Sequence, residues 1–419
     1  MNARAPLHHR LRPAVGRDPD EPHRAASPLE LLYDLTFVIA FGATSVQLAH
    51  AIAAGHTGSG LLAFAFATFA VAWAWINYSW WASAFDTDDW FVRLMTLVQM
   101  VGVLILSLGV PEVFASIEEG RLELGVVVLG YVVMRLGMLA LWIRVAVQDR
   151  VHRRTALGFI LSLAIAQCGW IALGLGHAPL VGGLLAAVPL YLVETVGPVV
   201  AERRFTSTPW HPHHIAERYS LLTIITLGEV ILGTATTIGA IVQESGWTVD
   251  AGIVGFAGTA LAFALWWTYF MMPSGVLLAR FRRRGFSWGY GHLVVFGALV
   301  ATGAGLDVAA LATAGETRLP TLTVASAVAI PVAVLLLAFF TLYSALIGTF
   351  DPFHVALIAG ALAMLALSML VAALDAPLAA WLSLVVAAPV VVIVGYETIG
   401  HRHQAARLEQ LLEPAATEA

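Results

Sequence analysis

Arg135 lies in the middle of an apolar run, residues 124–147, that is long enough to cross a lipid bilayer. A guanidinium in hydrocarbon is costly unless it meets a carboxylate or a water-filled cavity. Three acidic residues in other apolar runs are candidate partners, namely Asp34, Glu194 and Glu229. Pairing would lower the cost of burying each group, but the sequence does not tell which pair forms. Arg135 therefore predicts a membrane protein with a polar interior.

Two carboxylates begin the first apolar segment. Glu30 and Asp34 are four residues apart, so they share one face of a helix. The Ser27-Pro-Leu-Glu30 sequence is typical of a capping box, which gives Glu30 a structural interpretation as well as a functional one. Asp34 lies beyond the cap, where exposure to lipid would cost about 2.5–3.5 kcal/mol. We expect Asp34 to face the bundle interior in an ion pair or a functional site.

The densest polar stretch is residues 211–229. His213 with Glu217, and His214 with Arg218, are both spaced to lie along one helix face. Such a cluster could hold zinc, or it could lie at the membrane interface and cap the helix. We favour the interface, because no second histidine cluster supplies further ligands, and we predict no metal and no cofactor.

Glu229 lies about 22 Å along the same helix, near the middle of a bilayer. In the run at 288–312, His292 could relay protons or be a satisfied structural histidine. Glu194 is expected close to the cytoplasmic end of its segment, where it could also be interfacial. Trp73 and Trp75 could line a cavity, but packing is the favoured interpretation. The predicted substrate or ion pathway comprises five residues, Asp34, Arg135, Glu217, Arg218 and Glu229. Five further residues are secondary candidates, Glu30, Glu194, His214, His292 and Asp307.

The composition sets the class of protein. Of 419 residues, 59% are hydrophobic and only 12% are charged, against about 25% in a soluble domain. The single cysteine, Cys168, excludes a disulfide framework and a cysteine-based metal site. There is no P-loop, dinucleotide fingerprint, zinc-protease motif or nucleophile elbow, and nothing indicates binding to nucleic acid. We expect the lipid bilayer and a small solute or ion as partners, and the oligomeric state is open.

Apolar runs predict an all-α polytopic protein with about 12 transmembrane helices. The twelve runs are residues 29–53, 60–84, 91–114, 123–146, 155–176, 179–200, 214–242, 250–272, 288–312, 320–347, 353–374 and 377–399. With the N-terminus in the cytoplasm, 19 arginines fall in cytoplasmic segments and 2 in external loops. This asymmetry predicts a multi-pass protein of the bacterial inner membrane with both termini in the cytoplasm.

The two halves of the chain show weak internal similarity. Glu30 and Trp80 match Glu217 and Trp267 at one offset of 187 residues. Later in each half, Glu194-Thr-Val-Gly resembles Glu397-Thr-Ile-Gly. Six crossings per half would give two parallel repeats. The predicted organisation is a disordered cytoplasmic tail, two six-helix repeats and a second tail, at residues 1–28, 29–200, 201–401 and 402–419.

Two motifs carry a resemblance to a known family. The segments 27–41 and 214–229, together with Arg135 and Tyr290-Gly-His292, are similar to those of the bacterial low temperature requirement protein A family. The resemblance covers most of the membrane region. It implies an association with growth in the cold and defines no reaction.

Three functions remain as hypotheses. A transporter or channel for a small solute or ion, with proton coupling, would use the buried acid–arginine pathway. An intramembrane enzyme acting on a lipid-like substrate would use the cluster from His211 to Glu217. A structural or sensor protein linked to growth in the cold would use the charges only to hold its fold. The transporter is the working hypothesis, and an enzyme is the less favoured class.

Overall fold

The computed structural model describes residues 11–22, 24–176 and 178–412. Helices dominate it, and within these residues the strands are a single short antiparallel pair, β1 (Arg121–Leu122) with β2 (Ala178–Pro179). Twelve segments are long and apolar enough to cross a membrane, and their bounds follow the predicted runs to within a few residues at most ends. The predicted all-α polytopic class and the number of spans are therefore confirmed.

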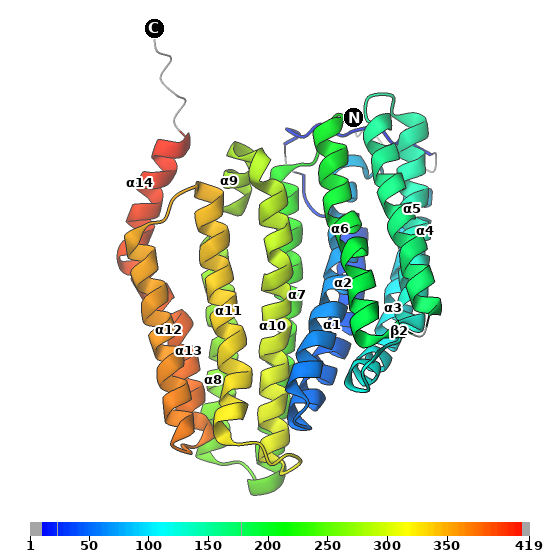
Figure 1. The fold of residues 1–419 in the computed structure, drawn as a ribbon. Coiled ribbons are helices and arrows are strands. Elements are labelled where there is room, and N and C mark those ends of the chain that lie inside the picture. Colours follow the sequence, from blue (N-terminus) through cyan, green and yellow to red (C-terminus); the bar gives the residue numbers. More distant parts are fainter. Residues whose placement is uncertain (1–10, 23, 177, 413–419) are drawn as a thin grey trace, which may run out of the picture. The chain divides into compact units, whose positions relative to one another are not determined.

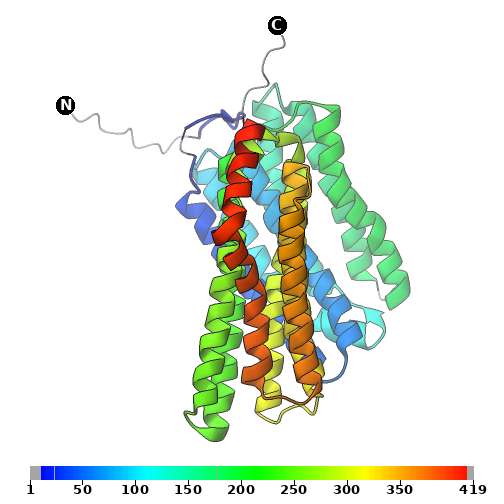
Figure 2. The same ribbon diagram turned by 90° about the vertical axis from the view of Figure 1, so that its left-hand side faces the viewer.

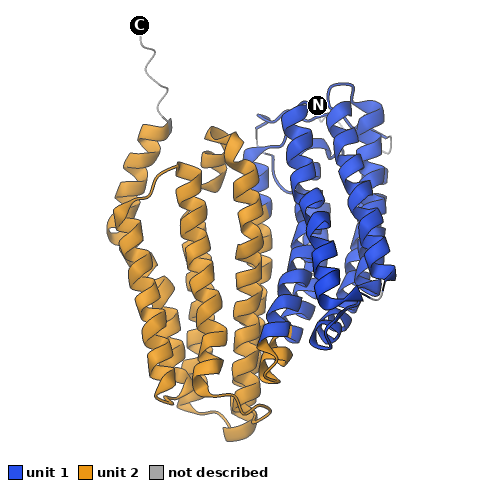
Figure 3. Cartoon of the chain, viewed as in Figure 1, with its two compact units in different colours: residues 1–47, 58–218 blue, residues 48–57, 219–419 orange. Residues whose placement is uncertain are grey.

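The chain divides into two compact units (Figure 3). Unit 1 comprises residues 1–47 and 58–218, and unit 2 comprises residues 48–57 and 219–419. The division falls inside two helices, α1 and α7, so each contributes its first part to unit 1 and its remainder to unit 2. The predicted pair of parallel repeats stays a prediction, because a division into units does not establish internal symmetry.

Unit 1 contains the helices that position the charged residues. They are α1 (Pro28–Ala53, to residue 47), α2 (Thr57–Phe85), α3 (Trp90–Glu118), α4 (Gly125–Gln148), α5 (Arg153–Leu175), α6 (Leu180–Arg204) and the start of α7 (Pro212–Ser245). Consecutive helices α3 to α6 pack side by side (Figure 1). Small residues allow the closest approach: a Cβ on Gly130 of α4 would lie 2.4 Å from the backbone nitrogen of Leu106 in α3.

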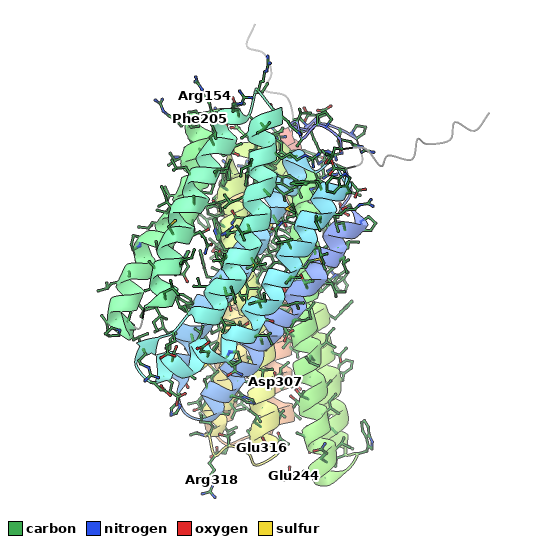
Figure 4. The ribbon with its side chains drawn as sticks, turned by 90° about the vertical axis from the view of Figure 1, so that its right-hand side faces the viewer. Arg154, Phe205, Glu244, Asp307, Glu316 and Arg318 are labelled. Atoms are coloured by element: carbon green, nitrogen blue, oxygen red, sulfur yellow. The ribbon has the colours of Figure 1, made fainter. Side chains whose placement is uncertain are left out.

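Unit 2 contains the remaining helices. They are the rest of α7, α8 (Val249–Phe270), α9 (Ser274–Arg280), α10 (Gly285–Thr313), α11 (Thr321–Ile347), α12 (Pro352–Ala373), α13 (Leu378–Gly395) and α14 (His401–Leu412), with a 3-10 turn at Arg282–Arg284 and a π-helical turn at Tyr396–Gly400. Figure 2 shows α13, the π-helical turn and α14 as one long bent rod. Figure 4 shows Glu244, Glu316 and Arg318 at one end of this unit, whereas α9 and α14 lie at the other (Figure 1).

The N-terminal segment that we expected to be a disordered tail is hydrogen-bonded to unit 1 in its described part. The backbone N–H groups of Ala14 and Gly16 donate to Gln148 Oε1 and Asp149 Oδ2, at 2.7 and 2.8 Å. Arg24 Nη2 donates to the backbone oxygen of Ala82 at 3.1 Å. Ala14 is buried. Residues 11–22 and 24–27 therefore form a strap across the end of unit 1 at which α2 ends and α3 begins.

Candidate functional site

The first buried charge cluster joins α1 to the start of α7, and we call Glu30, Asp34, His214 and Arg218 the Arg218 cluster. Arg218 Nη2 lies 2.6 Å from Asp34 Oδ1, and Arg218 Nη1 lies 3.4 Å from Glu30 Oε1. His214 Nε2 lies 3.1 Å from the same Glu30 oxygen. Each of the four residues is 0% exposed. The structure thus brings together four of the residues that the sequence predicted.

Neighbouring groups hold these side chains in place. The predicted capping box is present: the N–H of Ser27 donates to Glu30 Oε2 at 2.7 Å, and the N–H of Glu30 donates back to Ser27 Oγ at 3.3 Å. The indole N–H of Trp75 donates to Asp34 Oδ1 at 2.6 Å. Arg218 Nη2 also donates to Ser79 Oγ at 3.2 Å. Glu30 is therefore both a helix cap and a member of the ionic cluster, where we had set these interpretations against each other.

The Arg218 cluster contains more acidic than basic groups. Glu30 and Asp34 share the single guanidinium of Arg218, so the cluster carries one negative charge when His214 is neutral. One added proton, on His214 or on a carboxylate, makes it neutral. Charge that is buried without compensation is expensive, so both carboxylates depend on the guanidinium of Arg218.

The second buried pair connects α4 and α6, and we call Arg135, Glu194, Tyr131 and Trp73 the Arg135 cluster. Arg135 Nη2 lies 2.5 Å from Glu194 Oε2, and the two residues are 3% and 4% exposed. Arg135 Nη2 also donates to Tyr131 Oη at 2.8 Å, and its guanidinium lies 4.6 Å from the centre of that ring. The indole N–H of Trp73 donates to Glu194 Oε2 at 2.7 Å. Glu194 is thus the partner of Arg135 and is buried rather than interfacial.

A pocket reaches the Arg135 cluster within unit 1. It encloses about 350 Å³ of empty volume, and its walls include Phe66, Phe69 and Trp170. Tyr191 and Glu194 line it as well. Among the described residues, the Tyr191 hydroxyl has no hydrogen-bond partner, although it is buried. An aromatic pocket with a few free polar groups is the usual form of a small-molecule site.

One helix serves both clusters. Trp73 and Trp75 are two residues apart in α2, and residues at that spacing point to different sides of a helix. Trp73 therefore reaches Glu194 whereas Trp75 reaches Asp34. We expected packing for both indoles and so missed their role as donors to buried carboxylates. Two tryptophans spaced i, i+2 in a span that is otherwise apolar were the available signal.

Two acidic residues outside the spans, Asp86 and Asp89, have pKa values shifted in opposite directions. Burial, followed by the charge of Glu30, raises the pKa of Asp86 to about 6. Burial would also raise the pKa of Asp89, but a hydrogen bond from Arg144 and the N–H of Val92 hold that pKa below its usual range. The loop between α2 and α3 thus has two buried carboxylates next to the strap.

The remaining predicted residues lie elsewhere. Glu217 is exposed and accepts a hydrogen bond from the N–H of Ala26 at 3.1 Å, so it holds the strap and is outside the Arg218 cluster. Glu229 belongs to unit 2, where it is buried and its backbone oxygen lies against Gly303 of α10. The predicted pathway is therefore divided between two buried clusters, the strap and unit 2.

Two secondary candidates have local partners in unit 2. His292 is 0% exposed, and its ring nitrogens lie 3.1 Å from Tyr269 Oη and 2.8 Å from the backbone oxygen of Trp288. Asp307, half-buried in α10, accepts a hydrogen bond from Thr236 Oγ1 at 2.6 Å. These contacts fit the interpretation of His292 as a satisfied structural histidine.

The histidines before α7 are part of the packing of unit 1. His211 Nε2 lies 3.0 Å from the backbone oxygen of Glu21 in the strap. The backbone N–H of His211 donates to Ser83 Oγ at 3.0 Å. His213 is exposed. In the described residues, 11–22, 24–176 and 178–412, no three His, Cys, Asp or Glu side chains are grouped so as to hold a metal ion.

Comparison with known proteins agrees with the motifs in α1 and α7. The family model described as bacterial low temperature requirement A protein matches residues 25–390. An uncharacterized protein of Rhizobium meliloti (strain 1021) is 28% identical over 298 residues, which cover 67% of this chain and 69% of that protein. No solved structure gives a significant match. The family match includes both buried clusters, and the chain belongs to the bacterial low temperature requirement A protein family.

Proposed function

We propose that this protein is a transporter or channel that moves a small solute or ion across the bacterial inner membrane, coupled to protons, with both termini in the cytoplasm. Twelve membrane-crossing segments and ionisable groups buried within them support the proposal. Charged residues in membrane spans are costly, and they commonly mark ion and substrate pathways. The distribution of arginines along the sequence supports the orientation.

The observation that carries the proposal is the pocket at the Arg135 cluster. Glu194, whose Oε2 is held by Arg135 and Trp73, lines a pocket that also contains an unpartnered tyrosine hydroxyl. A bound molecule would bury its apolar part against Phe66 and Phe69 and would donate a hydrogen bond to Glu194. This geometry favours a small solute with an apolar body and one donor group.

The Arg218 cluster supports the coupling to protons. Its two carboxylates share one guanidinium, so taking up one proton removes a buried net charge. Carboxylates held near a guanidinium exchange protons when the pair opens and closes. In this proposal the Arg218 cluster holds the coupling proton and Glu194 contacts the solute.

Proteoliposomes loaded with a pH-sensitive dye test this function. A panel of small amines, alcohols and amino acids is added outside, and proton movement is followed for the wild type and for Glu194→Gln. We expect at least one solute to drive proton movement and Glu194→Gln to reduce its rate by about tenfold or more, because the solute loses a charged partner. Glu217→Gln is the matched control, since it changes an exposed carboxylate of the same unit, and it should retain the rate. A folded wild type that moves neither solutes nor ions would refute the proposal.

A specific observation favours one alternative, a structural or sensor protein. The Arg218 cluster is fully enclosed, as expected of charges that fix a fold. If the Arg135 cluster serves only the fold, Arg135→Met combined with Glu194→Gln should leave both stability and growth in the cold unchanged. A folded double variant that has lost growth in the cold would exclude that alternative.

A further inference from the structure

Unit 2 contains a larger pocket that the proposed function does not use. It has about 600 Å³ of empty volume, part of it open to the surroundings, and lies between α8, α11, α12 and α13. Its walls are mainly aliphatic and aromatic, with Leu336, Phe339, Ile358 and Val392 among them. From Tyr343 near the end of α11 to Leu336, the wall runs about 10 Å along the helix.

The α8 wall of this pocket, near the rim, offers no free hydroxyl. Thr268 Oγ1 donates to the backbone oxygen of Ala264 at 2.8 Å. Tyr269 Oη lies 3.1 Å from His292 Nε2. Both hydroxyls already have partners. A polar ligand group placed there would therefore lose its hydrogen bonds to water and gain none from these hydroxyls, which costs free energy. This wall therefore fits an apolar chain.

The rim is polar and lies where α8 ends and α14 begins. Gln404 Nε2 donates to the backbone oxygen of Met271 at 3.2 Å, and the Tyr396 hydroxyl donates to Gln404 Oε1. Tyr396 begins the π-helical turn, a distortion that occurs frequently at functional sites. His354, at the start of α12, completes this rim. The pocket thus has a polar entrance and an apolar interior.

The end of unit 2 at this rim is positively charged. Six arginines lie in α9, the following turn and α14, namely Arg280, Arg282, Arg283, Arg284, Arg402 and Arg407. Three carboxylates in α14 and in the turns before it and before α12 oppose them, Asp351, Glu397 and Glu409, which leaves a net charge of +3 over the described residues of these segments. Arg280 Nε donates to the backbone oxygen of Leu411 at 3.0 Å, so the two arginine-rich segments are in contact. Arg407 is close enough to the pocket residue Tyr343 to act on it electrostatically.

We propose that this pocket binds one acyl chain of an anionic phospholipid, with the phosphate at the arginine-rich rim. A chain that enters from the headgroup level would bury methylene groups against Leu336 and Ile358, and each buried methylene contributes favourably. Basic pockets between transmembrane helices are known to bind anionic headgroups. A zwitterionic lipid would gain the apolar contacts without the net attraction of the rim.

Native mass spectrometry of the detergent-purified full-length chain tests this site. The protein is titrated with diacyl phosphatidylglycerol, with phosphatidylcholine of the same chains, and with glycerol phosphate alone. We expect retention of phosphatidylglycerol about tenfold stronger than of phosphatidylcholine, and no retention of glycerol phosphate. Equal retention of the two lipids would overturn the proposal, and so would retention of glycerol phosphate without lipid.

Two pairs of variants locate the site. Ile358→Trp fills the pocket and should reduce phosphatidylglycerol retention by about tenfold, whereas Leu367→Trp, at an exposed position of the same helix, should not. Arg407→Gln should weaken retention, whereas Arg318→Gln, at the opposite end of unit 2 (Figure 4), should not. If circular dichroism shows that Ile358→Trp does not fold, the comparison of Arg407→Gln with Arg318→Gln tests the site alone. Unchanged retention in Arg407→Gln and in a folded Ile358→Trp would refute the site.

Discussion

The two buried clusters of unit 1 have the same ingredients but differ in charge and access. Each has one arginine, a carboxylate within about 2.6 Å of it and an indole donor from α2. The Arg218 cluster has a second carboxylate and is fully enclosed. The Arg135 cluster has one carboxylate for one guanidinium, and a pocket reaches its Glu194. An enclosed cluster with excess charge suits holding a proton, whereas a neutral pair beside a pocket suits contact with a ligand.

The comparison also separates stability from function. A buried charge whose partner is removed stays in an apolar site, and the penalty depends on whether other groups can solvate it. Glu194 faces a pocket and keeps the Trp73 N–H, whereas Glu30 and Asp34 are enclosed by protein. We therefore expect the fold to depend more on Arg218, and the activity more directly on Arg135 and Glu194.

The largest expected effect is that of removing Arg218. Arg218→Met leaves two enclosed carboxylates without their cation, and we expect it to lower the free energy of unfolding by about 3–5 kcal/mol. Arg135→Met should cost less, because it leaves one carboxylate without its cation rather than two. Thermal and denaturant unfolding of the purified variants, followed by circular dichroism in detergent, measures both.

A triple variant is the control for this prediction. Combining Arg218→Met with Glu30→Gln and Asp34→Asn removes the uncompensated charges and should recover a large part of the lost stability. Equal losses for Arg218→Met and Arg135→Met would show that the second carboxylate of the Arg218 cluster adds no penalty. The proposed division between the clusters would then be wrong.

The sequence was informative about these clusters where the signal was local. Hydropathy predicted the spans because each must cover the bilayer with its own residues. The capping box was predictable because both partners lie within one turn. The need of Arg135 for a partner followed from the cost of burying its charge. The choice of Glu194 over Asp34 and Glu229 depends on how α4 and α6 pack, which no local pattern encodes.

The sequence also could not predict which face of α7 points into the protein. His213 with Glu217 and His214 with Arg218 are both spaced for one helix face, and neighbouring positions differ by about 100° of rotation. The structure buries His214 and Arg218 and exposes the other pair. Both pairs are polar, so hydrophobicity alone could not decide which faces inward. The predicted repeat was no guide either, because Glu30 is buried while its sequence match Glu217 is exposed.

A smaller effect is expected at Asp86, next to the Arg218 cluster. Burial and the charge of Glu30 raise the pKa of Asp86 from 3.8 to about 6 in the folded protein. The folded state therefore binds this proton more tightly than the unfolded state does. The contribution of the protonated carboxyl is fully present below about pH 3.8 and is lost as the pH rises through about 6. At pH 7 the ionised group costs up to about 3 kcal/mol.

Asp86→Asn should accordingly be more stable than the wild type at pH 7 and should lose that advantage near pH 4. Unfolding midpoints measured between pH 4 and 8 provide the test. Asp89→Asn is the matched control with the opposite sign, because Arg144 lowers the pKa of Asp89 and the variant should be destabilised at pH 7. An Asp86→Asn midpoint that follows the wild type at every pH would show that the pKa of Asp86 is not raised in the folded protein.

The smallest expected effect tests whether α2 links the two clusters. Trp73→Phe and Trp75→Phe each remove one N–H donor to a buried carboxylate, and each should cost about 2 kcal/mol. In double-mutant cycles, Trp73→Phe should couple to Glu194→Gln, and Trp75→Phe to Asp34→Asn, by about 1 kcal/mol or more. The crossed combinations, Trp73→Phe with Asp34→Asn and Trp75→Phe with Glu194→Gln, should be additive within about 0.5 kcal/mol. Crossed couplings as large as the direct ones would mean that the clusters act as one unit, so that a proton taken up near Asp34 would be felt at Glu194 through α2.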